Sequence, residues 1–249
     1  MLAAERKHEI LARLERDGRV LVAELVAGLS VSEDTIRRDL QELTAQGLAH
    51  RVHGGALASP PQVLPFERRL EIARKDKVAL AEAAVPLVES ARTLVVDGGT
   101  TATELARRLP ATWDGTLVTN APPVAAALAA HPKAEVILVG GRLLKDEQVA
   151  VGPAAVDAFR SLRADVCVLG VCALDPQIGA TAANDEEAHV KRAMVGCSAA
   201  VVALATRDKL HASYPWLVAA PTEIGHLVTD AGDDLTSAFA SAGVSVVAV

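Results

Sequence analysis

Two adjacent arginines near the start of the chain carry the chemistry of a nucleic-acid contact. Arg37 and Arg38 lie within residues 31–55, VSEDTIRRDLQELTAQGLAHRVHGG. The apolar residues of this run recur at helical spacing: Ile36, Leu40 and Leu43. At about 3.6 residues per turn, Arg38 points nearly opposite to that apolar stripe, and Arg37 and Thr35 flank it. Because a guanidinium fork fits phosphate oxygens or a guanine edge, the spacing predicts a recognition helix that contacts DNA.

The neighbouring residues set the limits of this helix and supply a wing. Ser32 is suited to the helix N-cap, and Gly47 is suited to end the helix. Residues 48–52 can form a strand, and His53-Gly54-Gly55 can form the turn of a winged hairpin. The residues predicted to contact DNA are Ser32, Thr35, Arg37, Arg38, Arg51, His53 and Gly54.

A simpler interpretation of Arg38 is a surface ion pair. Asp34 and Glu42 each lie four residues away, the spacing at which side chains meet on a helix. In that case the double arginine is only the solvated face of a small helical domain. The pattern alone leaves both interpretations open.

Two further helical patterns complete a helix-turn-helix arrangement. Residues 6–17 are amphipathic, and Gly18 is placed to end that helix. A short helix is predicted over residues 23–27, followed by a turn at Gly28-Leu29-Ser30.

A second set of polar residues follows an apolar strand in the middle of the chain. Asp97-Gly98-Gly99-Thr100-Thr101 comes directly after Leu94-Val95-Val96 and opens a helix. The glycines let the backbone approach a ligand closely, and free N–H groups and hydroxyls at a helix start can bind an anion. The alternative is an ordinary turn in which Thr101 is the N-cap and Glu104 completes a capping box.

Other polar groups end neighbouring strands or begin a later helix. Thr119-Asn120 and Gly140-Gly141 fall at the same rim of the expected sheet, although turns favour these residue types anyway. Asn184 is suited to an N-cap, and Glu187 can pair with Lys191 four residues on. Helix capping alone is sufficient to explain this last segment.

Alternating strand and helix patterns predict an α/β domain after residue 92. The predicted strands cover residues 93–97, 116–120, 135–140, 165–170, 200–205, 227–229 and 244–247. The predicted helices between them cover residues 102–109, 124–130, 154–162, 185–197 and 235–242. Val- and Leu-rich strands without polar alternation indicate a mostly parallel sheet covered on both faces.

A proline-containing stretch is expected to link this domain to the first. Ala58-Ser59-Pro60-Pro61 and then Pro65 precede a charged helix that begins near Phe66, and Pro86 is expected to kink or end the following apolar helix. The basic residues of this region are predicted to be solvated: Arg68, Arg69, Arg74, Lys75 and Lys77.

The composition limits the class of protein. Of 249 residues 51% are hydrophobic but only 2% aromatic, so the core must consist of Ala, Val and Leu. The formal net charge of −6 does not exclude DNA binding, because association depends on where the basic groups lie. Cys167, Cys172 and Cys197 have no metal-type spacing, and we expect neither disulfides nor a metal. Without a signal peptide or a membrane-length apolar run, a cytoplasmic location is expected.

The order of these residues resembles the DeoR family of bacterial transcriptional regulators. The motifs are Val31-Ser32, Thr35-Ile36-Arg37-Arg38-Asp39-Leu40 and His53-Gly54-Gly55-Ala56. Further on, residues 97–101, 118–120, 140–141 and 185–192 resemble the sensor domain of the same family. That resemblance implies a fold related to ribose-5-phosphate isomerase and a phosphorylated sugar or related metabolite as effector.

The resemblance also implies roles for individual residues. Asp97, Gly98, Gly99, Thr100 and Thr101 become contacts on the phosphate side. The remaining implied effector contacts are Thr119, Asn120, Gly141, Asp185, Glu186 and Lys191. The chain departs from the family pattern where Thr206 replaces an aspartate, although Lys209 remains, and where a glycine near Ala173 is absent.

Together these patterns predict a two-domain regulator. Residues 1–57 form a winged helix-turn-helix, residues 58–74 a linker and connecting helix, and residues 75–249 a mostly parallel α/β sensor and oligomerisation domain. The expected partners are double-stranded operator DNA, a phosphorylated effector and further copies of the chain in a dimer or tetramer. No catalytic residue, metal or cofactor is expected. The alternatives are a sugar-phosphate isomerase with a DNA-binding appendage, or a regulator whose pocket no longer binds a phosphosugar.

Overall fold

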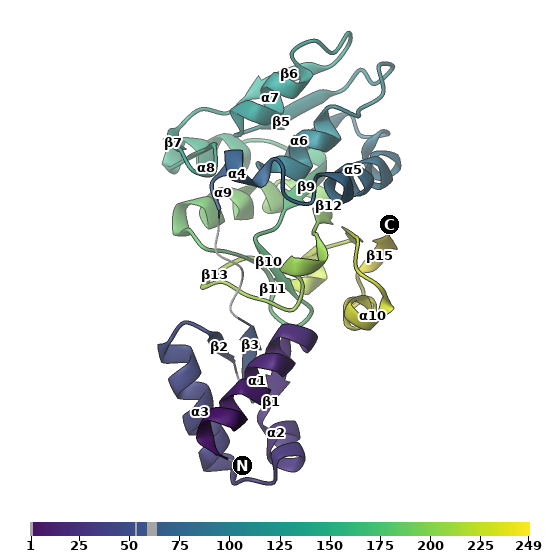
Figure 1. The fold of residues 1–249 in the computed structure, drawn as a ribbon. Coiled ribbons are helices and arrows are strands. Elements are labelled where there is room, and N and C mark those ends of the chain that lie inside the picture. The colour runs from purple at the N-terminus through teal and green to yellow at the C-terminus, as the bar shows by residue number, and fades with distance from the viewer. Residues whose placement is uncertain (1, 53, 59–63) are drawn as a thin grey trace.

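A computed structural model of the chain describes residues 2–52, 54–58 and 64–249. Its N-terminal unit has three helices beside a small antiparallel sheet with the strand order β1-β3-β2 (Figure 1). The elements are α1 (Ala3–Asp17), β1 (Arg19–Leu21), α2 (Val22–Leu29), α3 (Glu33–Ala45), β2 (Ala49–Val52) and β3 (Gly55–Ala58). This arrangement is a winged helix-turn-helix, as the sequence predicts.

The apolar residues at helical spacing form the core of this unit. The predicted stripe of α3 is at most 1% exposed and packs with Ile10 and Leu14 of α1. Gly18 ends α1 in the left-handed region at φ 71°, where its N–H donates to the Leu14 carbonyl at 2.8 Å. A buried ion pair, Arg6 Nε to Asp39 Oδ2 at 2.5 Å, joins α1 to α3.

Two details of this unit differ from the prediction. Strand β1 was not predicted, because a strand of three residues is recognisable only through its pairing with β3. Helix α2 continues through Gly28 to Leu29, so the turn before α3 falls at Ser30, whose φ is 53°. The predicted turn at residues 28–30 was therefore placed too early.

The larger unit is built on a seven-stranded sheet in which every neighbouring pair is parallel. The strand order is β15-β14-β12-β9-β4-β5-β6. The strands are β4 (Thr93–Val96), β5 (Thr116–Thr119), β6 (Glu135–Leu138), β9 (Ala164–Gly170), β12 (Ser198–Leu204), β14 (His226–Thr229) and β15 (Ser245–Ala248). All seven predicted strands are present, which confirms the predicted fold class.

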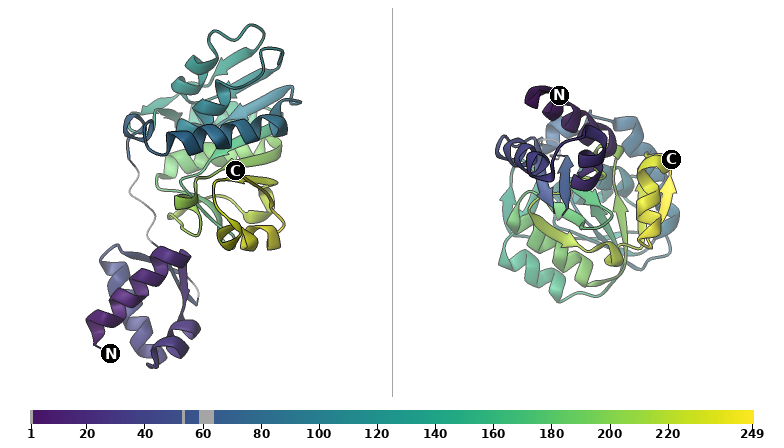
Figure 2. Two further views of the ribbon diagram at one scale, coloured as in Figure 1. Left: turned by 45° about the vertical axis from the view of Figure 1, so that its right-hand side comes forward. Right: turned by 90° about the horizontal axis from the view of Figure 1, so that it is seen from below.

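Helices cover both faces of this sheet (Figure 2). Helices α5, α6 and α7 pack on one face, and α8 and α9 on the other. The helices of this unit are α4 (Phe66–Arg69), α5 (Arg74–Val88), α6 (Thr100–Ala106), α7 (Pro122–Leu128), α8 (Pro153–Arg160), α9 (Asp185–Gly196) and α10 (Asp233–Ser241), with the short 3-10 helices η1 (Arg207–Lys209) and η2 (Pro221–Glu223). Pro86 lies within α5, which ends two residues later at Val88.

Short antiparallel strands flank the main sheet and were not predicted. A hairpin consists of β7 (Arg142–Leu144) and β8 (Val149–Val151). A three-stranded sheet, ordered β10-β11-β13, consists of β10 (Ala173–Asp175), β11 (Gly179–Ala182) and β13 (Trp216–Ala219). Both groups follow main-sheet strands in the sequence, and Val149 of β8 lies against the turn after β4.

The order of the main strands places the expected ligand site. From β4 the chain moves through β5 and β6 toward one edge, whereas β9, β12, β14 and β15 lead toward the other. Strands β4 and β9 are therefore neighbours at the point where the winding direction reverses. Ligands of open parallel sheets bind outside the carboxyl ends of the strands at such a point.

The sheet has an open edge at β6. This strand pairs with β5 on one side only, and Ile137 and Leu138 are 44% and 50% exposed. Lys133 and Glu135 are also exposed at its beginning.

The segment that leads into the larger unit is held against the β7–β8 hairpin. We call residues 64–73, which include α4, the connecting segment. Phe66 N–H donates to the Asp146 carbonyl at 2.6 Å, and Gln148 Nε2 donates to Glu67 Oε1 at 3.1 Å. Most of the predicted proline linker, residues 59–63, lies outside the described residues. Within the part of the chain that the structure describes, no helix is both long and apolar enough to cross a membrane.

Candidate functional site

The recognition helix presents Arg38 to solvent. Ser32 caps α3 by accepting a hydrogen bond from the Thr35 N–H at 3.3 Å. Arg37 pairs with Glu33 at 2.5 Å, and Glu42 is occupied by Lys7 of α1. Among the described residues, no carboxylate lies within ion-pair distance of the exposed Arg38, so the alternative pairing with Asp34 or Glu42 is wrong.

The wing lies beside the same helix. Arg51 of β2 is exposed, and its Nη1 donates to the Arg37 carbonyl at 3.5 Å. Gly54 is exposed at φ 83°, and His53 lies outside the described residues. The structure therefore brings Arg51 next to the exposed arginines of α3, as a groove-binding surface requires.

A cavity of about 450 Å³ opens beyond the carboxyl ends of the main strands. A narrow extension of about 30 Å³ continues it to the β4–β9 switch point. Residues that line both parts are Arg69, Thr100, Val171, Cys172 and Lys209. The extension is also lined by the Gly98–Ala102 turn, Glu147, Gly170, Glu187 and Lys191. We call this space the cleft.

A buried ion cluster forms the floor of the cleft. Lys191 of α9 donates to Asp97, to the Gly170 carbonyl at 2.7 Å and to Glu187 at 3.2 Å. Burial alone would lower the pKa of Lys191, but the two carboxylates outweigh it and raise that pKa. Gly170 N–H donates to the Asp97 carboxylate at 3.1 Å, so this side chain ties β4 to β9 and α9. Asp97, predicted on the phosphate side, is thus occupied by Lys191.

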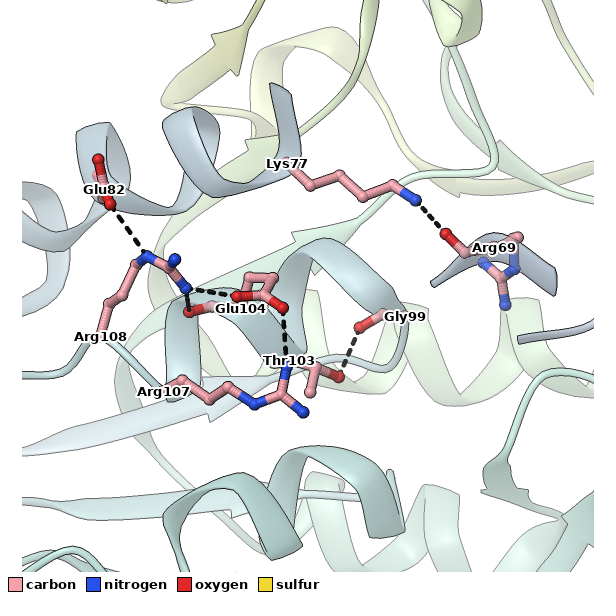
Figure 3. Close-up of polar contacts among 8 residues, drawn as sticks. All are labelled: Arg69, Lys77, Glu82, Gly99, Thr103, Glu104, Arg107 and Arg108. Carbon is pink, nitrogen blue, oxygen red and sulfur yellow. Dashed lines mark hydrogen bonds and ion pairs between the residues drawn. The ribbon is translucent and has the colours of Figure 1, made fainter. Parts of the chain in front are cut away.

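Three cations converge on the cleft without carboxylate partners. Lys77 of α5 donates from Nζ to the Arg69 carbonyl at 2.5 Å (Figure 3). Burial, and then repulsion from Lys209 and Arg69, lower the pKa of Lys77 to about 8. Burial also lowers the pKa of Lys209. Within the described chain, none of these three side chains forms a salt bridge, although Asp76, Asp208 and Asp230 also line the main cavity. The cations can therefore bind an anion beside carboxylates that accept hydrogen bonds from ligand hydroxyls.

Two of these cations overturn a sequence prediction. Lys77 is buried and Arg69 is half-buried, whereas the basic residues of this region were predicted to be solvated. Arg68, Arg74 and Lys75 are exposed as predicted. A charge run on a helix does not reveal which of its members faces a neighbouring element.

The glycine-threonine turn after β4 lines the cleft. Helix α6 begins at Thr100 with Gly99 as its N-cap at φ 107°, so Thr101 is not the cap. The Glu104 carboxylate is held by Arg107 at 2.7 Å and by Arg108 at 2.5 Å (Figure 3). The capping-box alternative is therefore wrong, and this carboxylate does not oppose an anion at the turn.

Gly98 is required by packing as well. A Cβ added there would stand 2.2 Å from Val149 Cγ1 of the β7–β8 hairpin. The bare backbone at this position therefore allows the hairpin to close over the end of β4.

The other predicted effector contacts do not line the cleft. Thr119 Oγ1 accepts from the Ala121 N–H at 3.1 Å, and Asn120 Nδ2 donates to the Ala150 carbonyl at 2.7 Å. A Cβ at Gly141 would meet the Val151 carbonyl at 2.5 Å, so that glycine serves the hairpin.

The acidic start of α9 is also placed differently from the prediction. Asp185 pairs with His189 at 3.1 Å, and Glu186 pairs with Arg142 of β7. Glu187, the next residue, is the carboxylate that reaches the cleft. The sequence predicted that Glu187 pairs with Lys191, which the structure confirms at 3.2 Å, but it did not place Glu187, Arg69, Lys77 or Lys209 in the site.

Thr206, the departure from the family pattern, is buried in the cleft wall. It precedes η1, and its carbonyl accepts from the Lys209 N–H at 2.9 Å. The substitution therefore removes a carboxylate from the backbone turn that carries Lys209.

Comparison with known proteins follows the same division of the chain. Residues 6–62 match a family model described as a DeoR-like helix-turn-helix domain, and residues 72–231 match a model of the DeoR C-terminal sensor domain. The regulator GlpR of Haloferax volcanii is 38% identical over 99% of this chain and 98% of its own length. The repressor GlcR of Bacillus subtilis is 30% identical over 92% and 89% of the two chains. The repressor CsqR of Escherichia coli K12 is 31% identical over 90% and 87%.

Solved structures resemble the chain only distantly. Ribose 5-phosphate isomerase A from Neisseria gonorrhoeae has a TM-score of 0.36 at 16% identity, over 53% of this chain and 52% of the isomerase. The eIF2B beta subunit from Chaetomium thermophilum has a TM-score of 0.44 at 14% identity, over 70% and 56%. Such distant likenesses say nothing about activity. The two family models and the full-length relatives agree with the geometry of α3 and of the cleft: the chain belongs to the DeoR family of DNA-binding transcriptional regulators.

Proposed function

We propose that this regulator represses a sugar or related carbon-catabolism operon and is released when a phosphorylated metabolite binds in the cleft. The observation that carries the proposal is the group of cations, Arg69, Lys77 and Lys209, which line the cleft and form no salt bridge within the described chain. The relatives GlcR and CsqR are named repressors, which supports the sign of regulation.

The size and lining of the cleft support a small polar anion. Cavities that hold small ligands typically span roughly 300–1,000 Å³, and this one measures about 450 Å³. The cations and the Gly98–Thr101 turn supply donors for phosphate oxygens. Glu147 also lines the extension, where its carboxylate can accept hydrogen bonds from ligand hydroxyls.

The DNA-contacting half of the proposal rests on α3 and the wing. Arg38 and Arg51 are exposed on neighbouring elements, with Ser32 and Thr35 at the helix start. We propose that the regulator binds operator DNA as a homodimer or homotetramer, because paired half-sites are read by paired recognition helices. The ligand then acts by favouring one arrangement of those paired helices over another.

The first prediction concerns Lys209. A panel of glucose 6-phosphate, fructose 1-phosphate and glycerol 3-phosphate, each beside its unphosphorylated counterpart, is to be screened by thermal shift. At about 100 times its dissociation constant, a true effector stabilises the fold by roughly 2.7 kcal/mol. Lys209→Met should abolish the shift, since it removes the charge and keeps most of the length.

Lys145→Met is the matched control, because Lys145 is exposed and does not line the cleft. Equal shifts with phosphorylated and unphosphorylated compounds would contradict a phosphate site. A turnover assay on the same panel tests the isomerase alternative. Release of operator DNA by the active compound completes the test of repression.

A further inference from the structure

The connecting segment forms one wall of the cleft. Leu64, Arg69, Ile72 and Ala73 all belong to residues 64–73, and all line the 450 Å³ cavity. Residues 59–63 separate this segment from Ala58, the last residue of the wing strand β3. The wall of the ligand site and the chain that leads to the DNA-binding domain are thus the same piece of backbone.

The connecting segment is held at both of its ends. Its N-terminal half is tied to the β7–β8 loop through Phe66 to Asp146 and through Glu67 to Gln148, and the Phe66 ring is buried. Its C-terminal half is tied to α5 by Lys77, whose Nζ donates to the Arg69 carbonyl and whose N–H donates to the Ala73 carbonyl at 3.0 Å. A ligand contact at Arg69 would add a tie between these two ends.

Arg69 carries an unused donor at the cleft. Its Nε is fully buried, and no acceptor within the described chain satisfies it. Its guanidinium lines both the main cavity and the narrow extension. Figure 3 shows the guanidinium extending away from the Lys77 ammonium group, which reaches the opposite, carbonyl side of Arg69. A buried donor without an acceptor is costly, so its position is explained by an acceptor that arrives with the ligand.

Lys209 stands on the other side of the same space. It belongs to η1, which follows β12 of the main sheet, and it lines both parts of the cleft together with Arg69. The two cations are close enough to repel one another. An anion placed between them would remove that repulsion and satisfy the Arg69 donor at once.

We propose that the anionic group of the effector binds Arg69 and Lys209 together and so ties the connecting segment to the main sheet. This inference rests on the proposed function. It adds that Arg69 is the residue through which ligand binding in the cleft affects the DNA-binding domain. Arg69 is a positioning residue in this scheme. It binds the ligand and, through its place in residues 64–73, fixes the start of the larger unit.

The test uses the full chain and two arginine variants. Arg69→Gln removes the charge and the fork, whereas Arg68→Gln changes the exposed neighbour that does not line the cleft. The ligand is whichever of glucose 6-phosphate, fructose 1-phosphate, glycerol 3-phosphate or inorganic phosphate stabilises the wild type most. Hydrogen exchange of residues 64–73 is measured by mass spectrometry with and without that compound, beside its affinity and its effect on operator binding.

The expected result has three parts. The ligand slows exchange of residues 64–73 in the wild type and in Arg68→Gln. Arg69→Gln loses that protection and binds the ligand roughly ten- to a hundredfold more weakly, the loss expected for one charge-assisted contact. Arg69→Gln needs correspondingly more ligand to release operator DNA, whereas Arg68→Gln releases it like the wild type.

Three results would overturn the inference. If the ligand stabilises Arg69→Gln as well as the wild type, Arg69 does not bind it, although the proposed function stands. If exchange of residues 64–73 is unchanged by a ligand that binds, the segment is not tied by it. If no compound stabilises the wild type, the proposed function fails first, and this inference fails with it.

Discussion

At the scale of single residues, neighbouring charges decide the pKa of the buried lysines of the cleft. Lys191 is surrounded by Asp97 and Glu187, so its charge is stabilised and its pKa is raised. Lys77 is buried beside cations, so its charge is destabilised and its pKa falls to about 8. The first lysine is a structural tie that is already neutralised. Lys77 can instead be neutralised by an anion that enters the cleft.

This difference predicts a pH dependence of ligand binding. The unfolded chain keeps the Lys77 pKa near 10.5, and the folded protein lowers it to about 8. Below pH 8, Lys77 is charged in both the folded and the unfolded protein, and its burial lowers the free energy of unfolding of the ligand-free protein. Between pH 8 and 10.5 the folded protein loses this proton first, so the free energy of unfolding rises with pH. A bound phosphate stabilises the protonated form of Lys77. The affinity of the protein for the phosphorylated ligand should therefore fall as the pH rises through about 8.

Isothermal titration calorimetry in buffers of different ionisation enthalpy measures how many protons the protein takes up when the ligand binds. Uptake of a proton near pH 8 is expected for the wild type, and Lys77→Met should remove it. Lys75→Met, a change of an exposed lysine on the same helix, should leave it intact. A proton uptake that persists in Lys77→Met would assign the titration to another group.

Arg38 allows a second prediction at this scale. Because it is exposed and unpaired within the described chain, Arg38→Ala should leave the melting temperature unchanged. Loss of a bidentate base contact should weaken specific operator binding by about 1–3 kcal/mol. A contact to phosphate would instead weaken binding to all sequences alike and reduce the salt slope by about one.

Glu24→Ala, an exposed change on α2, is the control. Fluorescence anisotropy on operator and random duplexes over a range of salt separates the two kinds of contact. Unchanged affinity on both duplexes would exclude Arg38 from the DNA interface.

At the scale of elements, the sequence was sufficient for the main parallel sheet. All seven of its strands were predicted, because apolar runs such as Leu94-Val95-Val96 need no partner to be recognised. The strands β1, β7, β8, β10, β11 and β13 are only three or four residues long and were missed. Four of them form two short hairpins, β7–β8 and β10–β11, and β13 pairs with a strand distant in sequence, as Ala219 does with Ala180. In runs this short the apolar pattern repeats too few times to mark a strand.

Only part of the effector site was predicted from the sequence. The Gly98–Thr101 turn was placed at the rim because strand ends can be located from the sequence, whereas Lys191 was assigned to the site by the resemblance to the family. Glu187 was not chosen over Asp185 and Glu186, since consecutive helical residues point about 100° apart and only packing decides which faces the cleft. Arg69 and Lys77 come from the segment before the first main strand, and no local signal connects them to η1.

The wing supplies a prediction at the scale of elements. A Cβ at Gly55 would stand 2.0 Å from the Val20 carbonyl of β1, whose strand pairs with β3. Gly55→Ala should therefore force the two strands apart and cost about 1–3 kcal/mol of stability in the N-terminal unit. Gly54→Ala tests backbone strain alone, because its φ is 83° but no atom lies within 4 Å of an added Cβ.

Urea denaturation followed by circular dichroism measures both variants. A larger loss in Gly55→Ala than in Gly54→Ala is expected, with the ligand-dependent melting shift retained in both. Equal losses would show that the collision is relieved by a small backbone movement.

At the scale of the whole molecule, the basic groups are unevenly distributed. The chain carries a formal net charge of −6, yet Arg38 and Arg51 are exposed together and three cations line the cleft. An acidic protein is repelled by DNA except where such a basic surface faces it. Contact with the operator therefore depends on orientation, and it should weaken steeply as salt screens the few attractive groups.

The open edge at β6 has a consequence for how the protein behaves when crowded. Ile137 and Leu138 are 44% and 50% exposed on a strand whose outer backbone groups have no strand partner in the described chain. Such an edge is a template on which a second, partly folded copy can add a strand. Charged residues at the start of the strand, Lys133 and Glu135, act against this, because stacking copies in register would bring like charges together. These two surface charges therefore act against aggregation of the newly made chain at this edge.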